Sequence, residues 1–167
     1  ANNQWNAIST GDDVIELLRL IRTSMYTGAT SKNAMHSLND ARTKFYAFRQ
    51  TSRMSNAEYL RTFKGLVDAI EHLDGDIGAD HAIIRARIQE QNGDPDDNVA
   101  WTEMKAIVHE EYLAMDFFIK ADVKRFGALI ANTQNDYVSG QDKYPKDMNK
   151  AYDMLVNYVN PSKHPDS

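Results

Sequence analysis

The stretch "MSNAEYLRTFKGLVDAIEHLDG", residues 54–75, decides the fold class. Ser55 and Glu58 have the spacing of a capping box, in which each side chain accepts the other residue's backbone N–H at the start of a helix. Met54 and Tyr59 are placed to close over this start as a hydrophobic staple. The segment therefore predicts a helix, and its apolar residues recur every three or four positions, at Tyr59, Phe63, Leu66, Val67, Ile70 and Leu73.

The same helical period runs through most of the chain. No stretch alternates between apolar and polar residues as a half-buried strand would, and β-branched residues are sparse. We therefore expect an all-α bundle of about six to seven helices without a sheet, built as one unit or as two small lobes. Besides the helix described above, we expect helices near residues 12–27, 31–48, 81–91, 98–121, 122–139 and 147–158.

Helical spacing continues without interruption from Trp101 to Tyr137. One helix there would run for about 40 residues, whereas helices of globular proteins average roughly 11–12. We expect a break near Ala121, with Asp122 capping a new helix. Asp80 and Asp147 are likewise expected to cap the helices that follow them.

The segment "NGDPDDN", residues 92–98, is the most loop-like part of the chain. It is the best candidate for a hinge and for a boundary between two lobes. We expect one helical domain over residues 1–160, with this candidate boundary inside it. Residues 161–167, which include two prolines, are expected to form a flexible tail.

The last helix boundary lies in "NDYVSGQDKYPKDMNKAYDML", residues 135–155. We expect Gly140 to turn the chain and the Tyr144–Pro145 step to direct it into the final helix. Proline favours the first turn of a helix and is excluded from the interior, so Pro145 is expected to set the angle of entry.

The composition limits the functions that the chain can perform. It has no cysteine, which rules out disulfides, thiol nucleophiles and cysteine-bound zinc, and fits a reducing, cytoplasmic location. The net charge of −5, with basic residues dispersed among acids, argues against strong binding to nucleic acid. No apolar run approaches the roughly 20 residues of a transmembrane helix, and the first residues lack the pattern of a signal peptide.

The most site-like segment is "NGDPDDNVAWTE", residues 92–103. Asn92, Asp94 and Asp96 occupy the first, third and fifth positions of a calcium loop, and Glu103 occupies the twelfth. The sixth position, which needs glycine for a sharp turn, is Asp97. The other interpretation, a polar loop whose acidic residues cap the next helix, is favoured.

Other chemical motifs are incomplete. "HEEY", beginning at His109, lacks the second histidine one turn later that would bind zinc. "DGDIGADH", residues 74–81, has no second set of ligands. Neither a nucleophile elbow nor a phosphate-binding loop occurs. We expect no catalytic residues, no metal site, no cofactor and no enzymatic activity.

Paired aromatic residues at helical spacing raise the alternative of a stacking surface for single-stranded RNA. Such surfaces combine aromatic side chains with a positively charged groove, which this charge balance does not offer. Core packing and protein–protein contact are the better explanation for the pairs Tyr59 and Phe63, Phe117 and Phe118, and Tyr152 and Tyr158.

Two long stretches resemble a known family. The first, residues 41–78, has an apolar residue two positions before a glutamine, then a capping serine, then E-Y-x-x-x-F; these positions are Phe48, Gln50, Ser55, Glu58, Tyr59 and Phe63. The second, residues 123–158, has an Arg–aromatic–Gly step, an Asn–Asp pair, a Tyr–Pro step and an Ala–Tyr before leucine; these are Arg125, Phe126, Gly127, Asn135, Asp136, Tyr144, Pro145, Ala151, Tyr152 and Leu155.

In order and spacing these residues, with Trp5 and the "DDVIELLRLIR" that follows, resemble the Gag capsid region of LTR retrotransposons. The resemblance is to copia-type elements, particularly the Gag-like polyproteins of diatoms and other algae. It implies a structural capsid protein whose main partner is itself, assembling into virus-like particles that enclose element RNA. In such proteins a Cys/His zinc knuckle downstream commonly contacts RNA, so this cysteine-free chain is expected to meet RNA only indirectly or through a further segment. No membrane partner is implied.

The alternative function is a helical adaptor or regulatory module. Such a module would bind a protein partner, with the loop at residues 92–103 as a calcium-responsive switch.

Overall fold

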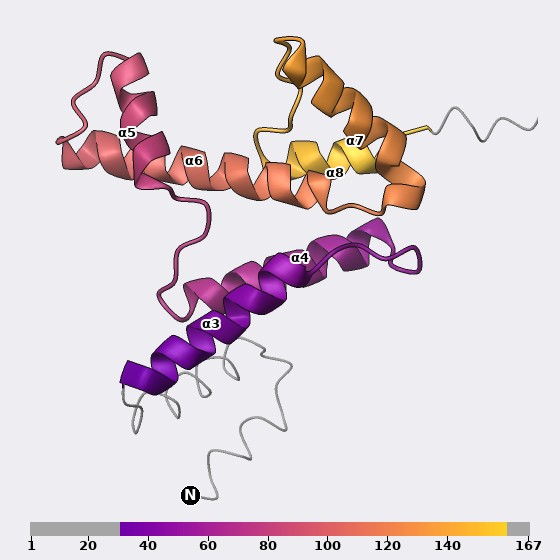
Figure 1. Ribbon diagram of the computed structural model, residues 1–167, viewed down its shortest axis with the longest axis horizontal. Helices are drawn as coiled ribbons and strands as arrows, with labels where there is room; N and C mark the ends of the chain where they lie inside the picture. The colour runs from indigo at the N-terminus through magenta and orange to yellow at the C-terminus, as the bar shows by residue number, and fades with distance from the viewer. Residues whose placement is uncertain (1–30, 160–167) are drawn as a thin grey trace, which may run out of the picture.

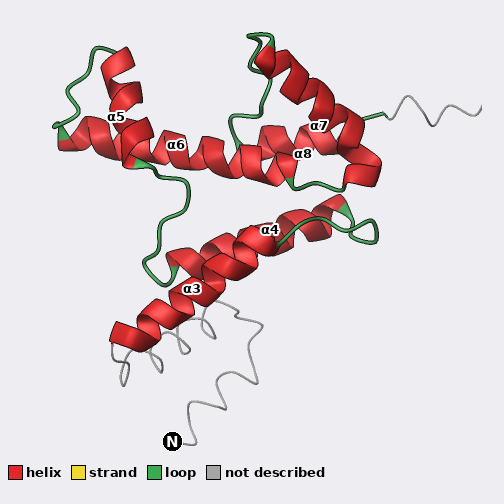
Figure 2. Cartoon of the chain, in the orientation of Figure 1, coloured by secondary structure: helices red, strands yellow, loops and turns green. Residues whose placement is uncertain are grey.

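The computed structural model describes residues 31–159, which form six α-helices and no strand. Figure 2 shows that loops alone connect them. The all-α prediction is therefore confirmed for this part of the chain. The helices are α3 (Ser31–Ala47), α4 (Asn56–Glu71), α5 (His81–Glu90), α6 (Asn98–Ile119), α7 (Val123–Val138) and α8 (Met148–Val156).

The long helix α6 is the axis of the fold. It packs against α5 near its start and against α8 near its end, while α3 and α4 pack together as a hairpin. In Figure 1, α5 and α7 rise from one side of α6, and α3 and α4 lie along the other side. Helix α4 also contacts α8, which joins the hairpin to the rest of the molecule.

Two apolar clusters hold these helices. The larger one joins α3, α4, α6, α7 and α8, and its fully buried side chains include Phe45, Tyr59, Phe63, Phe117 and Phe118. Burying one side chain of this size stabilises the fold by about 1.5–3 kcal/mol. Core packing is thus confirmed for four of the aromatic residues that sequence reasoning weighed as a stacking surface. The smaller cluster joins α5 to the first half of α6 and consists of Ile84, Ile88, Met104 and Val108.

Five helices begin at a side-chain cap. Ser55 and Glu58 form the predicted capping box, since the Ser55 hydroxyl accepts the N–H of Glu58 and the Glu58 carboxylate accepts the N–H of Ser55. Asp80, Asp122 and Asp147 cap α5, α7 and α8, as predicted. The expected break in the long helical segment is confirmed.

Three helices, α4, α5 and α7, end in the Schellman pattern, in which one residue adopts a left-handed conformation and two backbone bonds close the last turn. At the end of α7, Gly140 has φ of 89°, its N–H bonds Tyr137, and the N–H of Gln141 bonds Asp136. At the ends of α4 and α5 the left-handed residues are Asp74 and Asn92, each one position before the glycine.

The expected start of the last helix is confirmed, since Asp147 caps it. Helix α8 begins at Met148, after the cap at Asp147, so Pro145 lies outside its first turn. Pro145 is instead buried in the loop between α7 and α8.

Three expectations lie outside the described residues: Trp5, the helix expected near residues 12–27, and the tail at residues 161–167. On α3, Phe45 is fully buried, whereas Met35 is 71% exposed.

Candidate functional site

Gln50 joins two loops that are far apart in the sequence. Its backbone N–H donates to the carbonyl of Lys120 at 3.0 Å, and its side-chain oxygen accepts the N–H of Asp122 at 3.1 Å. Its side-chain nitrogen donates to Asn56 Oδ1 at 2.9 Å. Gln50 is 5% exposed, so these bonds satisfy polar groups that water cannot reach. The loop between α3 and α4 is thereby fixed to the loop between α6 and α7.

Arg125 reinforces the same junction from α7. Its Nε lies 2.9 Å from Asp122 Oδ2, and its Nη2 donates to the carbonyl of Met54 at 2.7 Å and to that of Thr51 at 3.3 Å. Asp122 also caps α7 by accepting the N–H of Lys124. One carboxylate therefore starts a helix and orients the guanidinium that holds the neighbouring loop.

A buried lysine completes this junction. Lys120 is 5% exposed, and its Nζ lies 2.7 Å from Asp116 Oδ2 and donates to the carbonyl of Phe45 at 3.2 Å. The ammonium also lies over the Phe45 ring, 4.4 Å from its centroid. Removing a charge from water is costly, so a lysine is retained at such a position only with close partners of this kind. We call Gln50, Lys120, Asp122 and Arg125 the junction residues.

Tyr59 lies next to the junction in the aromatic core. Its hydroxyl donates to the carbonyl of Phe117 at 2.7 Å, and its ring stacks on Phe117 with centroids 4.4 Å apart. Phe63 meets Phe117 edge to face at 5.2 Å. Burial, with a smaller contribution from the charge of Asp116, raises the pKa of Tyr59 well above its ordinary value. The hydroxyl is therefore a neutral, structural donor.

The structure brings the two resembling stretches together. Gln50, Ser55, Glu58 and Tyr59 from the first and Arg125 from the second lie at or beside the junction. Phe48 packs against the Tyr59 ring. Phe63, Phe126, Ala151 and Leu155 are buried in the larger cluster, and Tyr152 packs against it. Gly127 lies in the first turn of α7, where an added Cβ would come within 3.2 Å of Val123. These residues contribute packing and caps.

The remaining residues of the second stretch lie at the end of α7. The carbonyl of Asn135 accepts the N–H of Ser139 in the last turn, and Asp136 pairs with Lys143 at 2.9 Å. Tyr144 meets Phe118 edge to face at 6.3 Å and Tyr137 at 5.7 Å. This part of the stretch is separate from the junction, and its Tyr144 and Pro145 line a groove.

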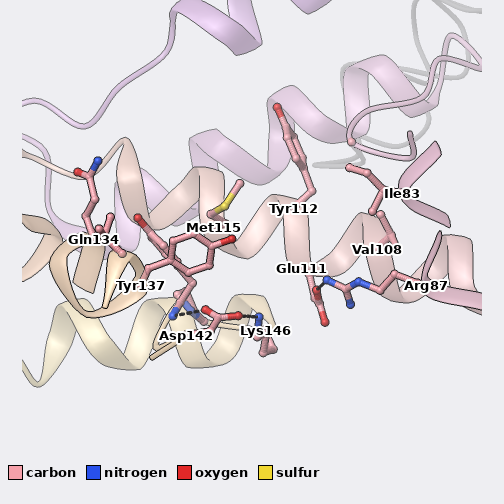
Figure 3. Close-up of a pocket in the computed structure, with 14 residues that line it drawn as sticks. Ile83, Arg87, Val108, Glu111, Tyr112, Met115, Gln134, Tyr137, Asp142 and Lys146 are labelled. Carbon is pink, nitrogen blue, oxygen red and sulfur yellow. Dashed lines mark hydrogen bonds and ion pairs between the residues drawn. The ribbon is translucent and has the colours of Figure 1, made fainter. Parts of the chain in front are cut away.

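The groove lies between α5 and α7, with the middle of α6 as its floor, and has a volume of about 540 Å³. Ile83 and Arg87 of α5 form one wall, and Tyr137, Val138 and the loop from Asp142 to Lys146 form the other. Met115 and Tyr112 of α6 lie at the floor, as Figure 3 shows. We call this feature the α5–α7 groove.

Each wall of the α5–α7 groove carries an ion pair. Arg87 bonds Glu111 on the α5 side and Lys146 bonds Asp142 on the other (Figure 3). The hydrogen bond from Lys146 holds the pKa of Asp142 below its ordinary value, and the bond to Glu111 raises that of Arg87. Asp142 and Arg87 are therefore both charged at neutral pH.

Gly78 lets the floor close tightly against the loop before α5. Its φ is +65°, and an added Cβ would lie 2.2 Å from ring atoms of Tyr112. Burial raises the pKa of Tyr112 to about 12. The backbone at this position therefore lies flat against the tyrosine ring, which only glycine permits.

The acidic loop at residues 92–98 uses its carboxylates for turns and caps. Asp97 accepts the N–H of Val99 at the start of α6, Asp94 accepts the N–H of Asp96, and Asp96 lies 3.6 Å from Arg85. Among residues 31–159, no three acidic or histidine side chains gather in a way that could hold a metal ion. The calcium-responsive version of the adaptor stays a prediction.

His109 has a structural position. Its Nδ1 lies 2.7 Å from the carbonyl of Ile77 and its Nε2 lies 3.1 Å from Glu71 Oε1, so it ties α6 to the end of α4. Within the described part of the chain, no helix combines the length and apolar content that crossing a membrane requires.

Sequence reasoning missed Lys120 and the α5–α7 groove. Lys120 is four residues after Asp116, a spacing that indicates a pair on one helix, but nothing in that spacing indicates burial. The groove is formed by four separate segments. The sequence indicated it only through the apolar residues Ile83, Tyr137 and Val138, which are exposed in the structure.

Comparisons of this chain with known protein families, with curated proteins and with solved structures found no match.

Proposed function

We propose that this chain is a structural capsid subunit of the Gag type, which assembles with copies of itself into virus-like particles enclosing element RNA. The observation that carries the proposal is the junction. Residues that the resemblance picks out in two stretches, Gln50 in the first and Arg125 in the second, act on the same pair of loops. Two motifs that occur in the order of the family and also act on the same pair of loops are more specific evidence for that family than either motif alone.

The roles of these residues support a scaffold. Gln50 and Arg125 satisfy backbone groups, Tyr59 bonds a backbone carbonyl, and the Ser55–Glu58 box starts a helix. Such bonds fix the relative position of helices, which a shell subunit needs if all copies are to make the same contacts. We propose accordingly that the chain is not an enzyme.

Surface properties support assembly through weak, repeated contacts. Exposed apolar side chains include Val99, Val123 and Val138, each more than half exposed. The net charge of −5 keeps the free subunit soluble. Contacts that are weak singly become strong when each subunit makes several.

Assembly is tested on the full chain by dynamic light scattering and negative-stain electron microscopy over a range of protein and salt concentrations. We expect particles or extended lattices above a threshold concentration. Nuclease treatment of the sample shows whether RNA holds them together. A chain that stays folded and monomeric at every concentration and salt would rule the proposal out.

The α5–α7 groove favours a second candidate, the helical adaptor. An apolar groove between helices can receive an amphipathic helix of a partner protein. A strictly monomeric chain that binds such a helix would support the adaptor over the capsid subunit. Its calcium-responsive version is tested by calorimetric titration, where the heat of binding must disappear in Asp96→Ala.

A further inference from the structure

The charges of the chain are separated in space. Residues 41–64 contain six basic residues and one acid, Glu58, whereas residues 65–98 contain nine acids and two basic residues. In Figure 1, the loop between α3 and α4 lies near the end of α6, and α5 and the loop at residues 92–98 lie near its start. Charges that look dispersed over the whole sequence are therefore polarised along the folded chain.

The start of α7 adds positive charge to the same end of the fold. Arg125 donates to two backbone carbonyls of the loop between α3 and α4, at 2.7 and 3.3 Å. This contact places Lys124, the exposed residue before it, beside that loop. Arg49 and Arg53 are exposed in the loop itself, and Arg61 is exposed in the second turn of α4. We call Arg49, Arg53, Arg61 and Lys124 the basic end.

Nearby acids do not neutralise the basic end. Within residues 31–159, none of its four side chains forms an ion pair. The acids closest to it along the chain are already engaged, since Glu58 accepts the N–H of Ser55 and Asp122 pairs with Arg125. Exposed cations gathered in this way attract an anionic partner.

The acids near the start of α6 make a second copy of the chain a poor partner for the basic end. Asp97 caps α6, Asp96 lies 3.6 Å from Arg85, and Asp76 pairs with Lys105, so these carboxylates are already engaged. A nucleic-acid backbone instead offers a row of phosphates without partners of their own. Three of the four side chains are arginines, and the planar guanidinium bonds a phosphate through two N–H groups at once.

We infer that the basic end binds the phosphate backbone of single-stranded RNA. This inference rests on the proposed function, in which the particle encloses RNA, and it orients the subunit with the basic end toward the interior. Phosphate contacts carry no sequence information, so binding does not depend on the base sequence. Because only four side chains oppose a net charge of −5, binding is weak and sensitive to salt.

Fluorescence anisotropy with a short labelled single-stranded RNA tests the inference on the full chain. The protein is kept below the concentration at which light scattering detects particles, so the measurement reports the unassembled subunit. The logarithm of the binding constant should fall with the logarithm of salt concentration at a slope of about −3, because each of four phosphate contacts contributes about 0.7. An RNA that does not bind even at low salt would overturn the inference.

The variant Arg49→Gln/Arg53→Gln should weaken binding and make the slope shallower by about 1.4, because two phosphate contacts are lost. The matched control, Arg85→Gln/Lys105→Gln, removes the same net charge from two exposed side chains near the start of α6, each paired with an acid. It should keep the wild-type slope, and circular dichroism checks that both variants are folded. An equal change in the two variants, or none in the first, would overturn the inference.

Photo-crosslinking to RNA that contains thiouridine needs no variant. Mass spectrometry of the crosslinked wild-type chain should place the crosslinks in residues 48–55 and 123–125. Crosslinks confined to other segments would overturn the inference. So would a chain that binds vesicles rich in phosphatidylserine but not RNA, because the basic end would then belong to a membrane surface.

Particle formation measured in parallel separates the two proposals. Particles without RNA binding would leave the capsid function standing and remove the RNA contact. RNA binding at the basic end of a chain that never assembles would keep the contact and remove the capsid function. After nuclease treatment, particles that form from wild type but not from Arg49→Gln/Arg53→Gln would show that the basic end contacts a second copy, which overturns the inference.

Discussion

The side-chain oxygen of Gln50 accepts the backbone N–H of Asp122 at 3.1 Å, although 72 residues separate them. Gln50 lies in the loop between α3 and α4, and Asp122 is the cap at the start of α7. Both groups are buried, so neither can exchange its partner for water. The bond makes the geometry of one helix pair depend on that of the other.

Gln50→Ala should lower the free energy of unfolding by about 1–3 kcal/mol, because it leaves the buried N–H of Asp122 without an acceptor. Urea unfolding followed by circular dichroism measures the change. Gln141→Ala, at an exposed position after α7, is the matched control and should change stability by less than about 0.5 kcal/mol. Equal losses in both variants would contradict the role of the junction.

The Ser55–Glu58 capping box should make the stability of the fold depend on pH in the acidic range. Hydrogen bonds from Ser55 lower the pKa of Glu58 below its ordinary value of 4.5. The contribution of Glu58 is then complete above pH 4.5 and is lost as the pH falls through the lower pKa of the folded state. The stability difference between wild type and Glu58→Gln should therefore vanish over that acidic range. Glu103→Gln, exposed on α6, controls for the lost charge.

Two glycines should respond to alanine in opposite directions. Gly78→Ala puts a Cβ 2.2 Å from the Tyr112 ring at a φ of +65°, so it should destabilise the fold by more than about 1 kcal/mol. Gly65 lies within α4 and has no heavy atom within 4 Å of an added Cβ, so Gly65→Ala should stabilise the fold by about 0.5–1 kcal/mol. Thermal unfolding compares them. A loss of stability in Gly65→Ala would contradict this account.

Two ion pairs of equal geometry should differ in their contribution to stability, because one is nearly buried and the other is exposed. Lys120–Asp116 and Lys44–Asp40 are both four residues apart with N–O distances of 2.7 Å, but the first is nearly buried and the second is exposed. Lys120→Met should cost about 3 kcal/mol, because it leaves a carboxylate largely out of water. Lys44→Met should change stability by less than about 1 kcal/mol.

The double variant Asp116→Leu/Lys120→Met checks the reason for this loss. Without an uncompensated charge, it should be more stable than Lys120→Met alone. Urea titrations of the three variants and the wild type give the coupling energy. A double variant less stable than Lys120→Met would show that packing, not charge, explains the loss.

Local chemistry made most of the fold predictable. The Ser55–Glu58 box and the caps at Asp80, Asp122 and Asp147 each depend on residues within three positions of one another, so the sequence displays them directly. The same holds for the fold class, since helical period is a local property. The burial of Pro145 in the loop before α8 is a tertiary property, which a local pattern does not display.

Long-range relationships were not predictable from a single sequence. Lys120 has the spacing of an ordinary surface pair, and it is buried beside Phe45 and Tyr46 of α3, which are distant in the sequence. The α5–α7 groove needs the positions of α5, α6, α7 and the loop after α7 at once. Neither helical periodicity nor capping residues indicate how the helices pack against one another.

The span of the Gln50–Asp122 bond also orders the events of folding. The α5–α6 hairpin closes over the short loop at residues 91–97, whereas the junction closes a loop of 72 residues, at an entropic cost about 2 kcal/mol greater. The hairpin is therefore expected to form early and the junction late. Contacts absent from the transition state govern the rate of unfolding rather than of folding. The junction is therefore expected to set how long the folded chain survives before it opens.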